Sequence, residues 1–212
     1  MPVAQLSIMS AIPSAEQSSS SAAESEEQRL IGRIAEGDKR AFEALFKQYG
    51  ERIFRYAYRL INDQGKAEEV TNDVMLEVWK TAAKFEGRSK VSTWLLGITR
   101  HLALNAVRRK QLDTVDVDEA PEIAAPADNT SAREHDQAVL KDALRAALTK
   151  LSPEHRDVVE LTFFHGCSYA EIAEIVQCPE NTVKTRMYHA RKQLQGLLVE
   201  AGLDPSNVEM AS

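Results

Sequence analysis

Apolar residues recur every three or four positions along most of this 212-residue chain, and no stretch shows the strict alternation of a half-buried strand. The spacing predicts helices over about 25–36, 42–60, 65–83, 92–110, 134–149, 153–165, 168–176 and 180–199. Gly50 can divide the second run into two helices, and Asn62-Asp63 is typical of a turn. The pattern therefore predicts an all-α protein.

Composition divides the chain into two helical domains and less regular segments. Residues 1–24 are rich in Ser, Ala and Glu, and we expect disorder because they hold too few apolar residues to offset the entropy of ordering. Residues 111–133 contain prolines and acids but no apolar periodicity, which is typical of a flexible linker. We therefore expect two small helical domains, at 25–110 and 134–200, joined by a flexible acidic linker at 111–133 and followed by a tail at 201–212.

The net charge of −6 hides a segregation of charge along the chain. Residues 88–110 and 181–199 contain Lys and Arg but no Asp or Glu, whereas residues 111–128 contain acids but no base. The average charge argues against nucleic acid as a partner, but the two acid-free tracts favour it.

The cysteines and the N-terminal residues indicate the cellular compartment in which we expect the protein. Cys167 and Cys178 do not make a disulfide framework, which fits a reducing compartment. No apolar run reaches the ~18 residues that cross a bilayer. No Lys or Arg precedes Arg29, although a signal peptide needs a positive start. We therefore expect a cytoplasmic protein that does not insert into the membrane.

The last helices have the form of a helix-turn-helix, in which the second helix enters the major groove of DNA. Ser168-x-x-Glu171 predicts a capping box, Cys178-Pro179 a break, and 180–199 a basic helix. The apolar face of that helix consists of Val183, Met187, Ala190 and Leu194. A basic helix alone is also typical of a solvated surface, but its combination with the capping box and the turn favours DNA binding.

The segments LSPEHR, YAEIAEI and TVKTRMYHARKQL resemble region 4 of the sigma-70 family, in particular its extracytoplasmic-function (ECF) group. The resemblance implies binding of duplex DNA at the −35 promoter element. The residues that it would place there are Thr182, Lys184, Thr185, Arg186, Tyr188, His189 and Arg191. Many relatives carry arginine at the position of His189, and a neutral histidine contributes less to phosphate binding.

The first half resembles region 2 of the same group, through AEEVTNDVMLEVW, the F-x-G loop, the STWL start and the RRK end of the fourth helix. The resemblance implies docking on the clamp helices of the largest subunit of RNA polymerase. The implied core-binding residues are Glu68, Glu69, Asn72, Asp73, Leu76 and Trp79. Carboxylates around apolar anchors suit a basic partner helix, although the same acids can be a solvated face with Trp79 in the core.

The same resemblance places recognition of the −10 element and of the melted strand in the loop at 85–90 and in the helix after it. The residues concerned are Phe85, Gly87, Arg88, Ser89, Lys90, Ser92, Thr93, Trp94, Arg100, Asn105, Arg108 and Arg109. Capture of unpaired bases needs a shaped pocket and a basic track for the strand. Trp94 is more often a core anchor than a stacking platform, and Arg108 and Arg109 can be general phosphate contacts.

The resemblance thus predicts an RNA polymerase sigma factor with three partners: core RNA polymerase, through its clamp helices and flap region, promoter DNA, and an anti-sigma factor. In that family the acidic linker passes through the polymerase, although an inert spacer is an alternative. We expect no enzyme, because no nucleophile–base pair or phosphate loop is evident. We expect no metal or other cofactor, since His165, Cys167 and Cys178 lack a zinc spacing. The rival hypothesis is a DNA-binding regulator whose first half is a sensor or dimerisation domain.

Overall fold

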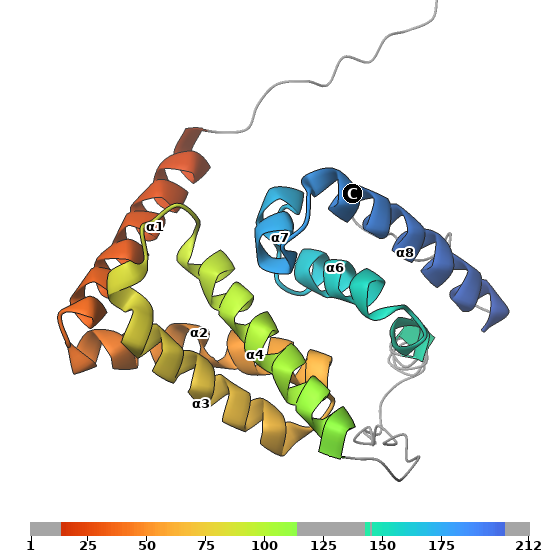
Figure 1. Ribbon diagram of the computed structural model, residues 1–212. Coiled ribbons are helices and arrows are strands. Elements are labelled where there is room, and N and C mark those ends of the chain that lie inside the picture. Colours follow the sequence, from red (N-terminus) through yellow and green to blue (C-terminus); the bar gives the residue numbers. More distant parts are fainter. Residues whose placement is uncertain (1–13, 114–142, 145, 202–212) are drawn as a thin grey trace, which may run out of the picture.

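The computed structural model describes residues 14–113, 143–144 and 146–201 of the chain, and within them it holds helices and no β-strand. In chain order these are α1 (Ser14–Ala35), α2 (Lys39–Ile61), α3 (Gln64–Thr81), the 3₁₀ turn η1 (Ala82–Lys84), α4 (Val91–Asp113), α6 (Pro153–Phe163), α7 (Tyr169–Val176) and α8 (Glu180–Glu200). The first group, α1 to α4, lies beside the second, α6 to α8, as Figure 1 shows. The prediction of an all-α protein with two helical domains is confirmed.

Local signals in the sequence set the helix ends. The carboxylate of Asp38 accepts hydrogen bonds from the backbone N–H groups of the first turn of α2, and Asn62 ends that helix in the left-handed conformation with φ 53°. Ser152 caps α6, and the predicted capping box of Ser168 and Glu171 opens α7. An N-cap contributes about 1 kcal/mol to helix stability. These capping residues therefore favour helix starts at these positions.

Three boundaries differ from those expected. α2 runs unbroken through Gly50, so the prediction of two helices there is wrong; the buried residues on either side of the glycine outweigh its cost of about 1 kcal/mol. α1 begins at Ser14, inside the segment 1–24 expected to be disordered, because Ala and Glu favour helix and continue the packed part of α1. α4 continues to Asp113, and the rest of the expected linker lies outside the described residues.

The first of two hydrophobic clusters, the N-terminal core, lies among α1 to α4. It is built from side chains such as Ile31, Leu45, Ile53, Val74 and Leu95. Amphipathic helices gain most of their stability from such packing rather than from intrinsic propensity. The core therefore fixes α4, which carries most of the predicted −10 residues.

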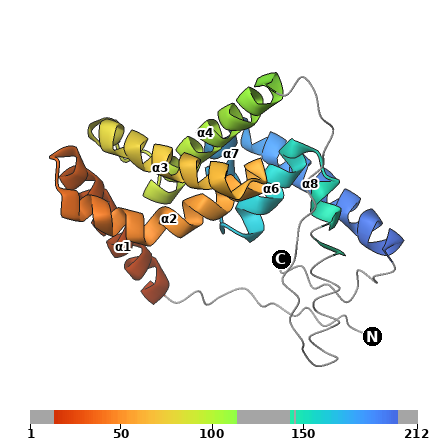
Figure 2. The same cartoon turned by 90° about the horizontal axis from the view of Figure 1, so that it is seen from below.

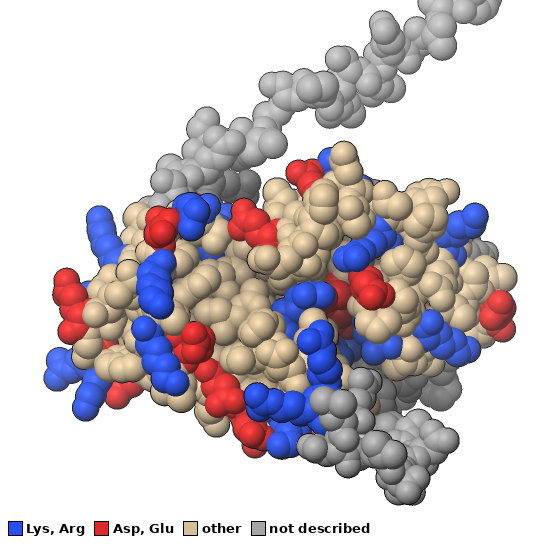
Figure 3. All heavy atoms as spheres, in the orientation of Figure 1, with Lys and Arg blue, Asp and Glu red and all other residues tan. Residues whose placement is uncertain are grey.

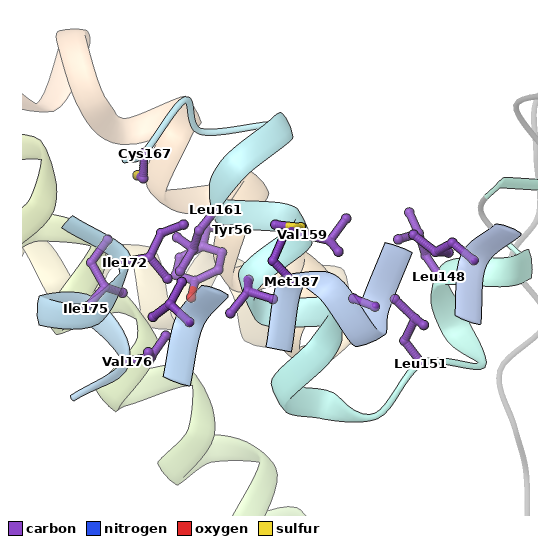
Figure 4. Close-up of a cluster of buried hydrophobic side chains, with 14 of the residues drawn as sticks. Tyr56, Leu148, Leu151, Val159, Leu161, Cys167, Ile172, Ile175, Val176 and Met187 are labelled. Carbon is purple, nitrogen blue, oxygen red and sulfur yellow. The ribbon is translucent and has the colours of Figure 1, made fainter. Parts of the chain in front are cut away.

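The second cluster, the C-terminal core, lies among α6, α7 and α8 and includes two residues from the first group of helices. Tyr56 of α2 and Leu96 of α4 are both fully buried in it, together with Leu161, Ile172 and Met187. Figure 4 shows Tyr56 among these side chains. The two groups of helices thus share apolar packing, and α4 and α7 lie side by side in both Figure 1 and Figure 2.

None of the described helices combines the length and the apolar character that a bilayer crossing requires.

Candidate nucleic-acid interface

Helices α7 and α8 form the predicted helix-turn-helix. Gln177 ends α7 in the left-handed conformation with φ 58°, and Pro179 directly precedes α8. The predicted apolar face of α8 is buried in the C-terminal core. The opposite face is therefore free to meet a ligand.

The seven predicted −35 residues share α8, but they are not equally accessible. Five are exposed, namely Lys184, Thr185, Tyr188, His189 and Arg191. The exposed fraction of Tyr188 is 64%. Thr182 and Arg186 are half-buried. The guanidinium of Arg186 leans back to the turn, where Nη1 lies 3.9 Å from the Cys178 sulfur. Lys184 forms an ion pair of 2.7 Å with Glu180 one turn earlier.

The structure adds a residue that the sequence pattern did not single out. The ring of His155, at the start of α6, stacks beside the ring of His189 at 6.2 Å between centroids. Tyr188 packs edge-on against the same His189 ring. Only the packing of α6 on α8 creates this group of three rings, because His155 lies on α6, outside the helix-turn-helix.

The predicted −10 loop is held by two aromatic rings and one glycine. The Phe85 and Trp94 rings lie 4.8 Å apart, and both pack against the N-terminal core. Gly87 has φ +67°, a conformation that side chains other than glycine rarely adopt. Trp94 is half-buried, so it both anchors the loop and reaches the surface.

An open hollow lies between α4 and α7 and has a volume of about 1170 Å³. Seven of the predicted −10 residues line it, namely Arg88, Ser89, Thr93, Trp94, Arg100, Asn105 and Arg108. Phe85, Gly87, Lys90, Ser92 and Arg109 lie outside the lining. Thr93 is itself buried and offers little surface to a strand. The far wall belongs to α7, through Glu174, Ile175 and Gln177.

The tract 88–110 has no acid in its sequence, but the fold brings acids to it from distant helices. Lys90 Nζ lies 3.2 Å from a Glu171 carboxylate oxygen and 3.4 Å from Glu24. Arg100 Nε donates a 2.5 Å hydrogen bond to Asp157 Oδ2. Figure 3 shows basic and acidic atoms together along the seam between the two groups of helices.

These contacts shift the pKa values of the groups involved. The hydrogen bond and charge of Glu171 raise the pKa of Lys90 above its usual value. Burial alone would raise the pKa of Glu171, but hydrogen bonds from Ser168 and Lys90 outweigh it and hold the pKa below the usual value. Likewise, burial opposes the charge of Arg100, but the bond to Asp157 outweighs it and raises the pKa of the guanidinium. Both basic groups therefore stay charged, Lys90 in an exposed position and Arg100 in a half-buried one.

A separate apolar groove of about 530 Å³ lies between α2 and α3. Three of the predicted core-binding residues line it, namely Asn72, Leu76 and Trp79, while the exposed acids Glu68, Glu69 and Asp73 lie outside the lining on the same helix. The groove also contains Phe42 and Phe46 of α2. Phe46 is 42% exposed, and Leu76 is 49% exposed.

His165 and the two cysteines lie near the seam, and no group of metal ligands is found among the described residues. Burial raises the pKa of the Cys167 thiol, and burial together with Arg52, Arg55 and Arg59 lowers the pKa of His165 to about 4. Cys167 and His165 are therefore neutral at pH 7.

The chain matches two family descriptions in order: "Sigma-70 region 2" over residues 45–112 and "Sigma-70, region 4" over residues 141–194. It is 31% identical to the RNA polymerase sigma-H factor of Pseudomonas aeruginosa, over 83% of this chain and 97% of that protein. It is 30% identical to the ECF RNA polymerase sigma factor SigK of Mycobacterium ulcerans, over 80% of this chain and 91% of that protein.

Among solved structures, the fold is similar to the sigma factor RpoE of Bartonella quintana, solved with the anti-sigma factor NepR, with a TM-score of 0.60 and 28% identity over 74% of this chain and 96% of that one. It is also similar in fold to CnrH, solved with the cytosolic domain of CnrY, with a TM-score of 0.61 and 21% identity over 82% of this chain and 97% of that one.

Proposed function

Since the chain belongs to the ECF group of the sigma-70 family, we propose that it directs core RNA polymerase to promoters through three separate surfaces. The observation that carries the proposal is the hollow beside α4, which gathers aromatic, amide and basic side chains in the same chain as an exposed recognition helix. A DNA-binding regulator with a sensor domain needs the recognition helix but not such a hollow. The protein acts in the cytoplasm, and the polymerisation chemistry belongs to the core enzyme.

The exposed face of α8 is the proposed −35 surface. Lys184, Thr185, Tyr188, His189 and Arg191 project from it, and each type can contact phosphates or base edges in the major groove. The half-buried Arg186 can reach DNA only by leaving the Cys178 sulfur, a weak contact at 3.9 Å. We therefore place Arg186 and Thr182 at the edge of this surface.

The hollow beside α4 is the proposed site for the melted −10 strand. Arg88 and Arg108 supply charge for the phosphates, Asn105 supplies an amide for base edges, and Trp94 supplies a ring on which a base can stack. Phe85 and Gly87 shape the loop, and Lys90, Ser92 and Arg109 extend the site beyond the lining. Thr93, which is buried, acts as a packing residue of this site.

The groove between α2 and α3 is the proposed dock for the clamp helices of polymerase. Phe46 and Leu76 offer exposed apolar anchors beside the half-buried Trp79, and the exposed acids Glu68, Glu69 and Asp73 lie on the same helix as Leu76. Such an apolar centre with a charged rim is the usual anatomy of a protein interface. An anti-sigma factor is a further proposed partner of the chain, because the similar sigma factor RpoE was solved with the anti-sigma factor NepR.

A promoter-selective transcription assay tests the proposal. The purified chain is combined with core RNA polymerase and a library of genomic promoter fragments, and run-off transcripts are sequenced. The proposal expects transcripts that begin at a shared pair of −35 and −10 elements and that are absent with core enzyme alone. Binding of duplex DNA by the chain without any transcription in the presence of core would instead support the regulator hypothesis.

A further inference from the structure

Helix α1 runs beside the loop at 85–90, which joins η1 to α4 and belongs to the proposed −10 site. It also packs on η1, directly before the loop. Glu24 and Gln28 are four residues apart in α1, so they share one face of the helix. Both reach the loop. A Glu24 carboxylate oxygen lies 3.4 Å from Lys90 Nζ, and the Gln28 side chain lies against Gly87. Helix α1 is therefore a further wall of this loop.

The contact between Gln28 and Gly87 depends on the missing side chain of the glycine. A Cβ built at Gly87 would lie 3.5 Å from Nε2 of Gln28 and 3.8 Å from its Cδ. The Gln28 amide thus occupies the space into which a longer side chain at Gly87 would project. The positive φ of Gly87, +67°, also favours glycine at this position. Gln28 therefore supplies, from another helix, the side chain that the loop lacks here.

The amide of Gln28 differs in chemistry from the loop side chains around it. Glu86 and Arg88, the neighbours of Gly87, form an ion pair of 2.8 Å with each other. Gln28 is exposed and carries no charge, and its amide offers an N–H donor next to a carbonyl acceptor. Such an amide can bond to two atoms on the edge of one base, as with N6 and N7 of adenine. At this point of the site, Gln28 is suited to read a base rather than a phosphate.

Gln28 lies where a strand that leaves the hollow beside α4 would pass. Arg88 and Ser89, which directly follow Gly87 in the loop, line that hollow, and Gln28 does not. A strand whose phosphate meets Arg88 therefore brings its next base toward Gly87 and α1. Enzymes and binding proteins read unstacked bases by hydrogen bonds to their edges, which is the contact that the Gln28 amide offers.

We propose that Gln28 is a specificity-determining residue of the −10 site, and that its amide binds the edge of one unpaired base of the promoter strand beside Gly87. Phosphate contacts hold a strand of any sequence, whereas contacts with base edges select the sequence. Gln28 therefore sets the base preference at one position and contributes little to the preference elsewhere. The inference rests on the proposed function for the identity of the strand.

Two variants of Gln28 separate base reading from packing. Gln28→Ala removes the amide. Gln28→Glu has nearly the same size and still fills the space beside Gly87, but it loses the N–H donors. The matched control is Gln48→Ala, because Gln48 is an exposed glutamine of α2 that donates a 3.0 Å hydrogen bond to Glu27 of α1. Its loss removes a contact with α1 and leaves the loop untouched. Circular dichroism establishes that each variant is folded.

The experiment measures base preference in the complete holoenzyme. Each chain is combined with core RNA polymerase and a promoter library that keeps one −35 element and is randomised over the −10 element and its flanks, and the transcripts are sequenced. Both Gln28 variants should lower the preference for the favoured base at one position by about fivefold or more. The other positions, and every position with Gln48→Ala, should keep the preference of the unaltered chain. A residue that only stabilises the fold would instead lower transcription from all promoters alike.

Unchanged base preferences in both Gln28 variants overturn the proposal. A loss with Gln28→Ala that Gln28→Glu does not share also overturns it, because packing would then explain the effect. The same holds for a loss that Gln48→Ala shares, which would indicate a general loosening of α1. Absence of promoter-specific transcripts with the unaltered chain is a separate outcome, and it would overturn the proposed function and this inference together.

Discussion

The hydroxyl of Tyr56 in α2 donates a hydrogen bond to the carboxylate of Asp157 in α6, and the two residues are 101 positions apart in the chain. Both side chains are buried, and Arg100 of α4 completes the contact from the other side of the carboxylate. Burial and the charge of Asp157 raise the pKa of Tyr56, so the tyrosine stays protonated and remains the donor. This group of three residues joins α2 and α4 of the first group of helices to α6 of the second.

Tyr56→Phe should destabilise the protein by about 1–3 kcal/mol, because it keeps the ring in the C-terminal core but leaves one oxygen of a buried carboxylate without its donor. Thermal or urea unfolding measures the change. Tyr58→Phe is the control, since Tyr58 lies on the same helix with its side chain exposed. Equal stability of the two variants would show that the hydroxyl of Tyr56 contributes nothing.

Stability should fall with acid because of His165. Its pKa of about 4 lies below the usual 6.5, so the unfolded chain binds a proton that the folded chain does not. The contribution is complete above about pH 6.5 and is lost as the pH falls toward 4, by about 1–2 kcal/mol once solvent screening is allowed for. His165→Gln, which cannot titrate, should show a smaller loss over that range in urea unfolding at each pH. Parallel curves for the two chains would contradict the assignment to His165.

Leu76→Asp should weaken the binding of core RNA polymerase by about tenfold or more, because it places a charge at an apolar anchor of the groove between α2 and α3. Leu76 is 49% exposed, so the change should leave the fold intact. The control is Val199→Asp, at a similarly exposed apolar residue near the end of α8. Competition against a labelled sigma factor for core enzyme measures both, and a loss shared by the two variants would indicate a general effect of charge.

Arg191→Ala should weaken −35 binding by about 1–3 kcal/mol if the side chain makes a base contact, whereas Arg186→Ala should cost less. The difference follows from their settings: Arg191 is exposed, while Arg186 is half-buried against the turn at Cys178. The acid-free tract 181–199 by itself predicts no such difference between the two arginines. Footprinting of the holoenzyme on a selected promoter decides between them, with Lys192→Ala as a basic control outside the predicted set.

Replacement of Gly87 and of Gly97 by alanine should change the stability of the protein in opposite directions. Gly87→Ala should destabilise by about 1–2 kcal/mol, because a residue with a Cβ is strained at the positive φ of the loop. Gly97→Ala should stabilise by about 0.5–1 kcal/mol, because Gly97 lies within α4 and an added Cβ there meets nothing within 4 Å. Thermal unfolding of both variants checks the pair, and a gain in stability for Gly87→Ala would contradict the structural assignment.

Local patterns in the sequence predicted a large part of the secondary structure. The capping box at Ser168 and Glu171 and the turn at Asn62 depend on neighbouring residues alone, and both are found as predicted. Family membership followed from the same kind of local pattern, because two motifs occurred in the expected order. Gly50 was misjudged, since the burial that keeps α2 continuous comes from other helices.

By itself, the sequence determined the helices, their caps, the helix-turn-helix and the two acid-free tracts. Only the tertiary structure determines which acidic residues contact the basic residues of those tracts. Lys90 and Arg100 have no acid within the tract, yet the packing of α4 against α6 and α7 supplies Glu171 and Asp157. Likewise, only packing makes Tyr56 part of the C-terminal core and leaves Phe46 exposed in a groove. The physical reason is that helix formation depends on residues within about one turn, whereas ion pairs and burial between helices depend on residues that the chain brings together from far apart.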